Sequence, residues 1–184
     1  MTTSSLKRGT LFGAALVLAT IAVMARCSDA AEPLSVTELT RQTHAHGLAV
    51  DRADPSRLYL ATHHGLYAIG RDGTATLLSE DRNDYMGFTP HPSDVTTLYA
   101  SGHPAGGGNL GVLASKDGGR TWRQIATGVN GPVDFHQMDV SSADPQVLYG
   151  AHAGSLQVSR DGGTTWSLVG PAPQGLIDLA ASAK

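Results

Sequence analysis

A repeated block of about 40 to 50 residues is the feature that most restricts how this chain can fold. Leu-Tyr pairs begin at Leu58, Leu98 and Leu148, and each pair follows an apolar run and a turn that contains Asp. Each unit then holds two more short runs that are separated by an Asp-Gly turn. Four short strands repeated at this period are typical of the blades of a β-propeller. We therefore predict an all-β fold, a β-propeller of four-stranded blades.

The strands and the blades can be placed from these runs. In the first unit we expect strands at 48–50, 58–61 and 66–69, with a fourth strand after the Asp-Gly turn. The blades then cover about 44–83, 84–132 and 133–174, residues 175–184 start a fourth blade, and residues 31–43 form a linker. About three and a half blades would leave open sheet edges and uncovered apolar faces. We interpret the propeller as incomplete, a truncated gene or a fragment, with an oligomer that closes the ring as the alternative.

The turn before the fourth strand carries the pattern Ser-x-Asp-x-Gly-x-Thr-Trp in two units. Its residues are Ser115, Asp117, Gly119 and Trp122 in one copy and Ser159, Asp161, Gly163 and Trp166 in the other, and a degenerate copy begins at Gly70. Gly allows a tight turn, Asp can accept hydrogen bonds from nearby backbone N–H groups, and Trp can pack between blades. We expect these residues to have structural roles. The pattern resembles the Asp box, or BNR repeat, of sialidases, sortilin-type receptors and photosystem II assembly propellers.

Segments such as His44-Ala-His-Gly-Leu48 and Asp134-Phe-His136 also resemble a group of bacterial exported propellers that carry a glycosyl-hydrolase-like label. This resemblance covers residues 44–184. The resemblance to sialidases implies three Arg side chains on the face where the first strands begin. Arg71, Arg120 and Arg160 lie instead in Asp-Gly turns on the opposite face. Sialidase chemistry is therefore not expected.

Residues 1–30 have the organisation of an export signal. Lys7 and Arg8 precede an uncharged run at 11–25, and small residues before Ala31 offer a cleavage site. Two alternatives remain open, a lipoprotein modified at Cys27 and an uncleaved anchor. The sequence predicts an exported bacterial protein that is periplasmic, secreted or held at the cell surface.

Composition and charge restrict the partners. The chain is 41% hydrophobic and 16% charged, which argues against disorder, and its net charge is −3 with no basic cluster. Nucleic acid is therefore not an expected partner, and a membrane is expected only through an N-terminal lipid or anchor. A small ligand, a metal ion or an extracytoplasmic protein remains.

Histidine is the unusual residue type, because seven of the eight histidines fall at two positions of the repeat. The first-strand entries and second-strand exits lie at one face of a propeller, since neighbouring strands run in opposite directions. We assign to this face His44, His46, His63, His64, Met86, His103, His136 and His152. His and Met ligands suit copper, and imidazole also suits zinc. A surface for a ligand or partner, or purely structural histidines, are the alternatives.

Asp84 and Asp134 occupy equivalent entry positions on adjacent units. Two carboxylates can act together in glycoside hydrolysis, so they are the candidate catalytic pair of a glycosidase-like enzyme. Our leading hypothesis is an exported binding propeller that is not an enzyme and whose histidine face binds a metal ion, small ligand or protein. The alternatives are the glycosidase-like enzyme and an inactive scaffold.

Overall fold

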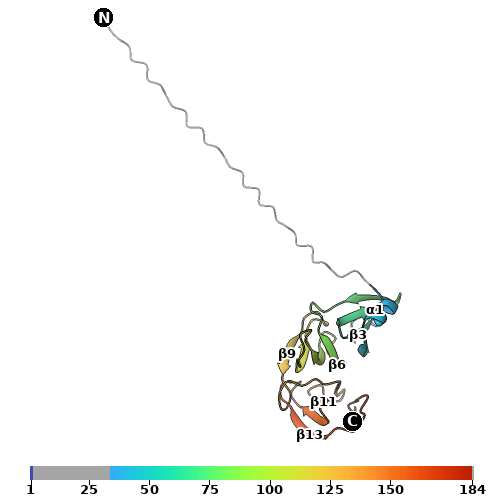
Figure 1. Ribbon diagram of the computed structural model, residues 1–184, viewed down its shortest axis with the longest axis vertical. Coiled ribbons are helices and arrows are strands. Elements are labelled where there is room, and N and C mark those ends of the chain that lie inside the picture. The colour runs from blue at the N-terminus through green and yellow to red at the C-terminus, as the bar shows by residue number, and fades with distance from the viewer. Residues whose placement is uncertain (2–33, 184) are drawn as a thin grey trace.

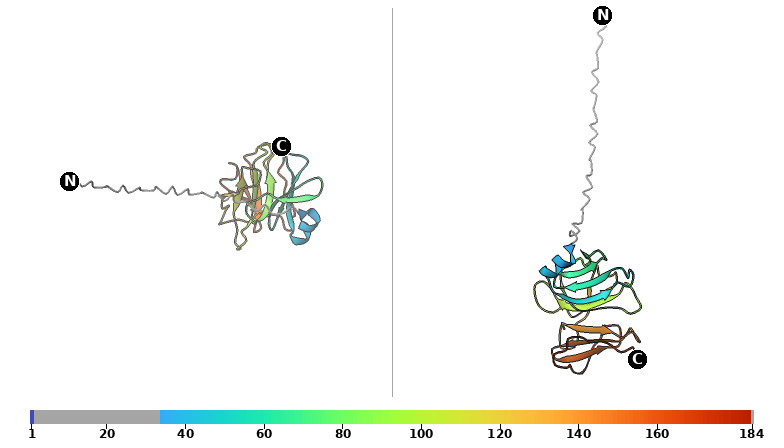
Figure 2. Two further views of the ribbon diagram at one scale, coloured as in Figure 1. Left: turned by 90° about the horizontal axis from the view of Figure 1, so that it is seen from above. Right: turned by 90° about the vertical axis from the view of Figure 1, so that its right-hand side faces the viewer.

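The computed structural model describes Met1 and residues 34–183, and within 34–183 the chain forms three antiparallel sheets that are stacked one after another (Figure 1, Figure 2). The first sheet has the strand order β1-β5-β4-β3-β2, the second β6-β7-β8-β9 and the third β10-β11-β12-β13. The strands β2, β6 and β10 each form one edge of their sheet and pack against one another in turn. This is the blade arrangement of a β-propeller, and the predicted all-β fold is confirmed.

The strand bounds follow the repeat. The first sheet consists of β1 Leu34–Ser35, β2 Ala45–Val50, β3 Leu58–Thr62, β4 Gly65–Ile69 and β5 Thr74–Leu77. The second consists of β6 Asp84–Pro90, β7 Leu98–His103, β8 Val112–Ser115 and β9 Arg123–Ala126. The third consists of β10 Gln137–Val140, β11 Leu148–His152, β12 Ser155–Ser159 and β13 Ser167–Pro171.

Apolar side chains that alternate along these strands meet between the sheets. Tyr59, Leu66 and Tyr85 belong to the buried cluster between the first and second sheets. Tyr99 and Phe135 belong to the matching cluster between the second and third. Each blade therefore stabilises its neighbours through burial of the faces that they share.

The segment expected to be a linker is structured where it is described. Residues Val36–Gln42 form the helix α1, and Ser35 caps it through a capping box with Glu38. Leu39 on this helix is only 1% exposed and belongs to a cluster with Leu60 and Tyr67 of the first sheet. The linker prediction is wrong here, because α1 covers an apolar blade face that would otherwise meet water (Figure 2).

The expected fourth first strand is not formed as a strand. The described residues 175–183 run beside β10, where the backbone N–H of Ala181 donates to Asp139 Oδ2 at 2.7 Å and the Ser141 hydroxyl donates to the Ser182 carbonyl at 3.3 Å. No strand of the described chain pairs with this segment, so it lacks the hydrogen-bond ladder that defines a strand.

The turns with the Ser-x-Asp pattern are held by side-chain hydrogen bonds. The Ser115 hydroxyl donates to Asp117 Oδ1 at 2.8 Å and accepts from the Gly119 N–H at 2.8 Å, and the Ser159 turn repeats both bonds. The ring of Trp122 lies 4.8 Å from that of Tyr85 and borders the core between the first and second sheets. These contacts are the ones expected of structural residues.

Two faces of the stack can be told apart by their backbone hydrogen bonds. On the turn face, the Gly118 N–H donates to the Thr96 carbonyl, which joins the β8–β9 turn to the β6–β7 turn. On the opposite face, which we call the loop face, the Gly65 N–H donates to Asn83 and the Gly111 N–H to Val133. These bonds join the β3–β4 turn and the β7–β8 loop to the segments that enter the next blades.

The segment predicted to be an export signal and the predicted lipidation site Cys27 lie outside the described residues. Among the residues that are described, the only helix is too short and too polar to span a bilayer.

Candidate metal and ligand site

The loop face brings together histidines and aspartates that the sequence had placed in separate hypotheses. Two groups of three side chains have ligand atoms within 4.8 Å of one another. We name His46, His63 and Asp84 junction site 1, since they lie where the first blade meets the second. His103, Asp134 and His136 form junction site 2, between the second and third blades.

In junction site 1, the carboxylate comes from the first residue of β6 and the imidazoles from the preceding blade. His63 Nδ1 lies 2.6 Å from Asp84 Oδ2, and His46 Nε2 lies 3.7 Å from Asp84 Oδ1. The two rings also touch, with His46 Nε2 at 3.1 Å from His63 Nε2. All three side chains are partly buried.

A β-bulge sets the position of His46. In the β2–β3 ladder, Ala45 pairs with Thr62 and Gly47 with Ala61, so His46 is the extra residue. A bulge interrupts the alternation of side chains along a strand, so the direction of His46 is set by the bulge. His44 is exposed, with its ring centroid 5.5 Å from that of His63, and it does not belong to the site.

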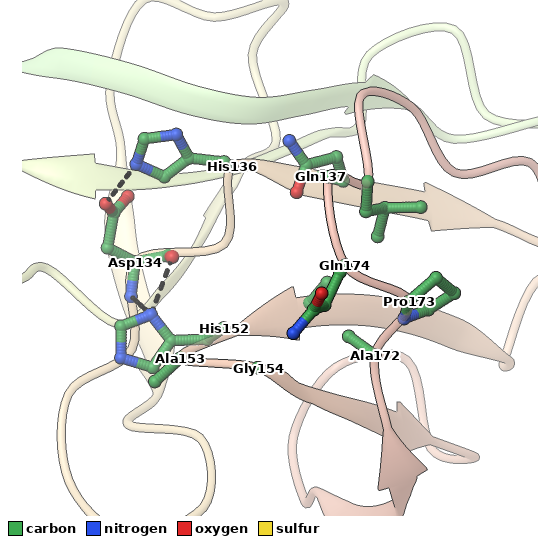
Figure 3. A pocket seen from close by; sticks show the side chains of 12 residues that line it. Asp134, His136, Gln137, His152, Ala153, Gly154, Ala172, Pro173 and Gln174 are labelled. Carbon is green, nitrogen blue, oxygen red and sulfur yellow. Dashed lines mark hydrogen bonds and ion pairs between the residues drawn. The ribbon is translucent and has the colours of Figure 1, made fainter.

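In junction site 2, two imidazoles converge on one carboxylate oxygen. His136 Nε2 lies 2.7 Å and His103 Nε2 lies 3.0 Å from Asp134 Oδ2. The Asp134 side chain is 7% exposed, whereas that of His136 is 55% exposed. The site therefore combines a buried carboxylate with an exposed imidazole. Figure 3 shows the His136 ring beside the Asp134 carboxylate.

Both aspartates have a buried oxygen that accepts no hydrogen bond from the residues that the structure describes, although His46 Nε2 lies 3.7 Å from that of Asp84. Asp84 Oδ1 and Asp134 Oδ1 are buried and have no hydrogen-bond partner among the described residues. A buried carboxylate oxygen without a partner is costly, because it has lost water and gained nothing in exchange. A cation bound between the carboxylate and the imidazoles would remove this cost at both sites.

The environments shift the pKa values of one imidazole in each site in opposite directions. Burial lowers the pKa of His46, and the neighbouring imidazoles of His63 and His136 act in the same direction, against the attraction of Asp84. The pKa of His103 is raised, first by a hydrogen bond from Nδ1 to the Gly108 carbonyl at 2.7 Å and then by Asp134 and Asp84. An Nδ1–H that donates to a backbone carbonyl leaves Nε2 directed at a metal, an arrangement common around metal-bound histidine.

The other predicted face residues lie outside these two groups. His152 Nδ1 lies 2.8 Å from the Asp134 carbonyl oxygen, so its ring supports the backbone of junction site 2. His64 is exposed in the β3–β4 turn, with its ring centroid 6.5 Å from that of His63. Met86 is 5% exposed and belongs to the buried apolar residues, so its side chain packs in the core.

Two cavities open beside the sites. A cavity of about 490 Å³ borders Asp134, His136 and His152 on one side and the residues 172–176 on the other (Figure 3). A second cavity of about 390 Å³ contacts His63 and Asp84 of junction site 1 and His103 of junction site 2. Both sites therefore adjoin space for a small ligand.

Sequence reasoning found the loop face but did not foresee the pairing of Asp with His. The signal was present in the repeat. Asp84 and Asp134 both lie at a blade entry, and His63 and His103 both lie at the second-strand exit of the preceding blade. Treating the aspartates only as a catalytic pair concealed this relation.

Comparison with known proteins supports the fold. No protein-family model and no curated protein match the sequence. A nutrient-binding protein from Bacteroides thetaiotaomicron is similar in structure, with a TM-score of 0.54, 11% identity, and coverage of 69% of this chain and 30% of that one. A GH74 enzyme from Niastella koreensis is also similar in structure, with a TM-score of 0.52, 19% identity, and coverage of 74% of this chain and 24% of that one.

A gluconolactonase from Xanthomonas campestris is also similar, with a TM-score of 0.50, 20% identity, and coverage of 68% of this chain and 46% of that one. The chain thus spans less than half the length of each of these three proteins. At these identities the similarity concerns the fold alone, and the fold that it supports is the β-propeller.

Proposed function

We propose that this protein is an exported β-propeller that binds divalent transition-metal ions on its loop face, one at each junction site. The observation that carries the proposal is the pair of buried, unpartnered oxygens Asp84 Oδ1 and Asp134 Oδ1, each beside two imidazoles. Two imidazoles and one carboxylate are a donor set that suits zinc and copper(II). The export part rests on the signal-like segment 1–30.

The distances favour this function over the glycosidase-like alternative. Asp84 Oδ2 and Asp134 Oδ2 are each within 3.0 Å of an imidazole nitrogen. A general acid must offer its proton to the substrate, whereas these oxygens are already occupied by ring nitrogens. The glycosidase and nutrient-binding functions of the structural neighbours belong to those proteins, and they fit a propeller that either binds or hydrolyses a ligand.

Calorimetric titration of the full chain with zinc and with copper tests the proposal. We expect two ions per chain for the wild type, one for His63→Ala and one for His103→Ala, since each variant loses a ligand of one site. His91→Ala is the matched control, because His91 lies in the β6–β7 turn on the turn face and should leave both ions bound.

Thermal unfolding of the metal-free variants establishes that they are folded. Equal, weak titration curves for the wild type and both site variants would refute the metal sites. If the chain also cleaved a glycan without metal, and Asp84→Asn and Asp134→Asn abolished that cleavage, the glycosidase alternative would replace the proposal.

A further inference from the structure

The cavity between the two junction sites has features that the metal ions alone do not require. It has a volume of about 390 Å³ and is bordered by the β3–β4 turn, the entry to β6 and the β7–β8 loop. Besides one carboxylate, Asp84, its lining contains three imidazoles and the guanidinium of Arg82. Its lining residues come from the turns and loops of the first and second blades on the loop face.

Arg82 is free to bind a ligand. Within the described chain it has no hydrogen bond and no ion pair, and it is exposed. Other arginines of the first blade are engaged, since Arg57 forms an ion pair with Asp51 and Arg52 donates to the His91 carbonyl oxygen. An unpaired guanidinium that borders a cavity is suited to a planar or tetrahedral oxyanion, which it can bind with two parallel hydrogen bonds.

The opposite wall gives an anion close access to the backbone. Pro104, Ala105 and Gly107 of the β7–β8 loop line it, and no atom lies within 4 Å of the position that a side chain would take on Gly107. The loop is tied to junction site 2, because His103 Nδ1 bonds to the Gly108 carbonyl. A ligand in this cavity therefore touches residues of both sites at once.

We infer that the cavity binds a small oxyanion, a carboxylate or a phosphonate-like group, which completes the coordination of the metal at junction site 1 while Arg82 holds its remaining oxygens. This inference rests on the proposed metal binding. Three protein ligands leave coordination positions open on zinc or copper. Without the metal, the Asp84 carboxylate would repel an anion, so the anion and the metal should each strengthen the binding of the other.

The test uses the full chain, loaded with zinc after the metal titration, and two probes, malonate as the carboxylate and methylphosphonate as the phosphate-like group. Calorimetry with the zinc-loaded wild type should detect binding of at least one probe. Arg82→Gln should weaken the affinity for that probe by about tenfold, as expected when a charged, bidentate contact is lost. Arg71→Gln is the control, because Arg71 lies in the β4–β5 turn, outside the cavity.

The outcomes separate the two proposals. Suppose that the wild type and Arg82→Gln bind zinc with equal affinity. If they then bind each probe with equal affinity, or bind neither probe, the oxyanion site is refuted while metal binding stands. If zinc does not bind, both proposals fall. Equal binding of a probe with and without zinc would also overturn the coordinated mode. If binding is as expected, the tighter probe identifies the ligand class as carboxylate or phosphate-like.

Discussion

Single residues on the loop face would set the pH at which each junction site could accept a metal ion. Coordination needs a neutral imidazole nitrogen, so protons compete with the metal. Burial lowers the pKa of His46, which keeps this ring neutral at a pH below the ordinary value of 6.5. The Gly108 carbonyl and Asp134 raise the pKa of His103, so this ring keeps its proton at a pH above 6.5.

We therefore expect junction site 1 to retain its metal at a lower pH than junction site 2. The His103→Ala variant keeps only junction site 1. Its zinc affinity should begin to fall only below pH 6.5, where His46 takes up a proton and competes with the metal. In His46→Ala, which leaves only site 2, the fall should begin above pH 6.5, because a metal must displace the proton of His103. Calorimetric titrations between about pH 5 and 8 measure both curves. Superimposable curves would contradict the assigned environments.

At the scale of secondary-structure elements, α1 forms an additional layer on the first sheet. Leu39 is fully buried against β3 and β4, while Thr37 on the same helix is exposed. A helix of 7 residues has little stability of its own, so it is held by this contact and by its capping box. The first blade is covered by an element from its own chain rather than by another blade.

Leu39→Ala should lower the free energy of unfolding by about 2–5 kcal/mol, the usual cost of removing a buried leucine side chain. Chemical denaturation followed by tryptophan fluorescence measures this change, and Thr37→Ala should stay within about 0.5 kcal/mol of the wild type. Zinc binding per folded molecule should be the same in both variants, since α1 contributes no residue to either junction site. An unchanged midpoint for Leu39→Ala would show that α1 is not part of the cooperative unit.

At the scale of the whole molecule, the blades depend on close contact between neighbouring sheets. Gly87 in β6 has φ +51°, and a Cβ atom there would lie 2.4 Å from the Phe135 carbonyl oxygen of the next blade. Glycine accommodates both the backbone conformation and the contact. Phe135 stands between the junction site 2 ligands Asp134 and His136, so the spacing of these blades also sets the geometry of that site.

Gly87→Ala should force the second and third blades apart and lower the free energy of unfolding by about 1–3 kcal/mol. Zinc affinity should decrease more at junction site 2 than at junction site 1. Gly170→Ala in β13 is the control, because no atom lies within 4 Å of its added Cβ and its φ is not positive. Thermal melts and zinc titrations of both variants give the comparison. Equal weakening of the two sites would show that Gly87 acts through β6 alone.

The sequence by itself determined the blades, the braced turns and the face that carries the histidines. These features depend on short-range order: a strand, a turn and the next strand, repeated with strands that alternate in direction. Even α1 had a local signal, the Ser35-x-x-Glu38 capping box, which the linker prediction overlooked.

Only the tertiary structure decided which side chains meet. Whether His63 reaches Asp84, or His103 reaches Asp134, depends on how one sheet packs against the next. The bulge at His46 and the register shift between Met86 and Thr89 alter the side-chain directions that simple alternation predicts. Contacts between sheets are fixed by the packing of whole blade faces, and no periodicity within a single strand specifies them.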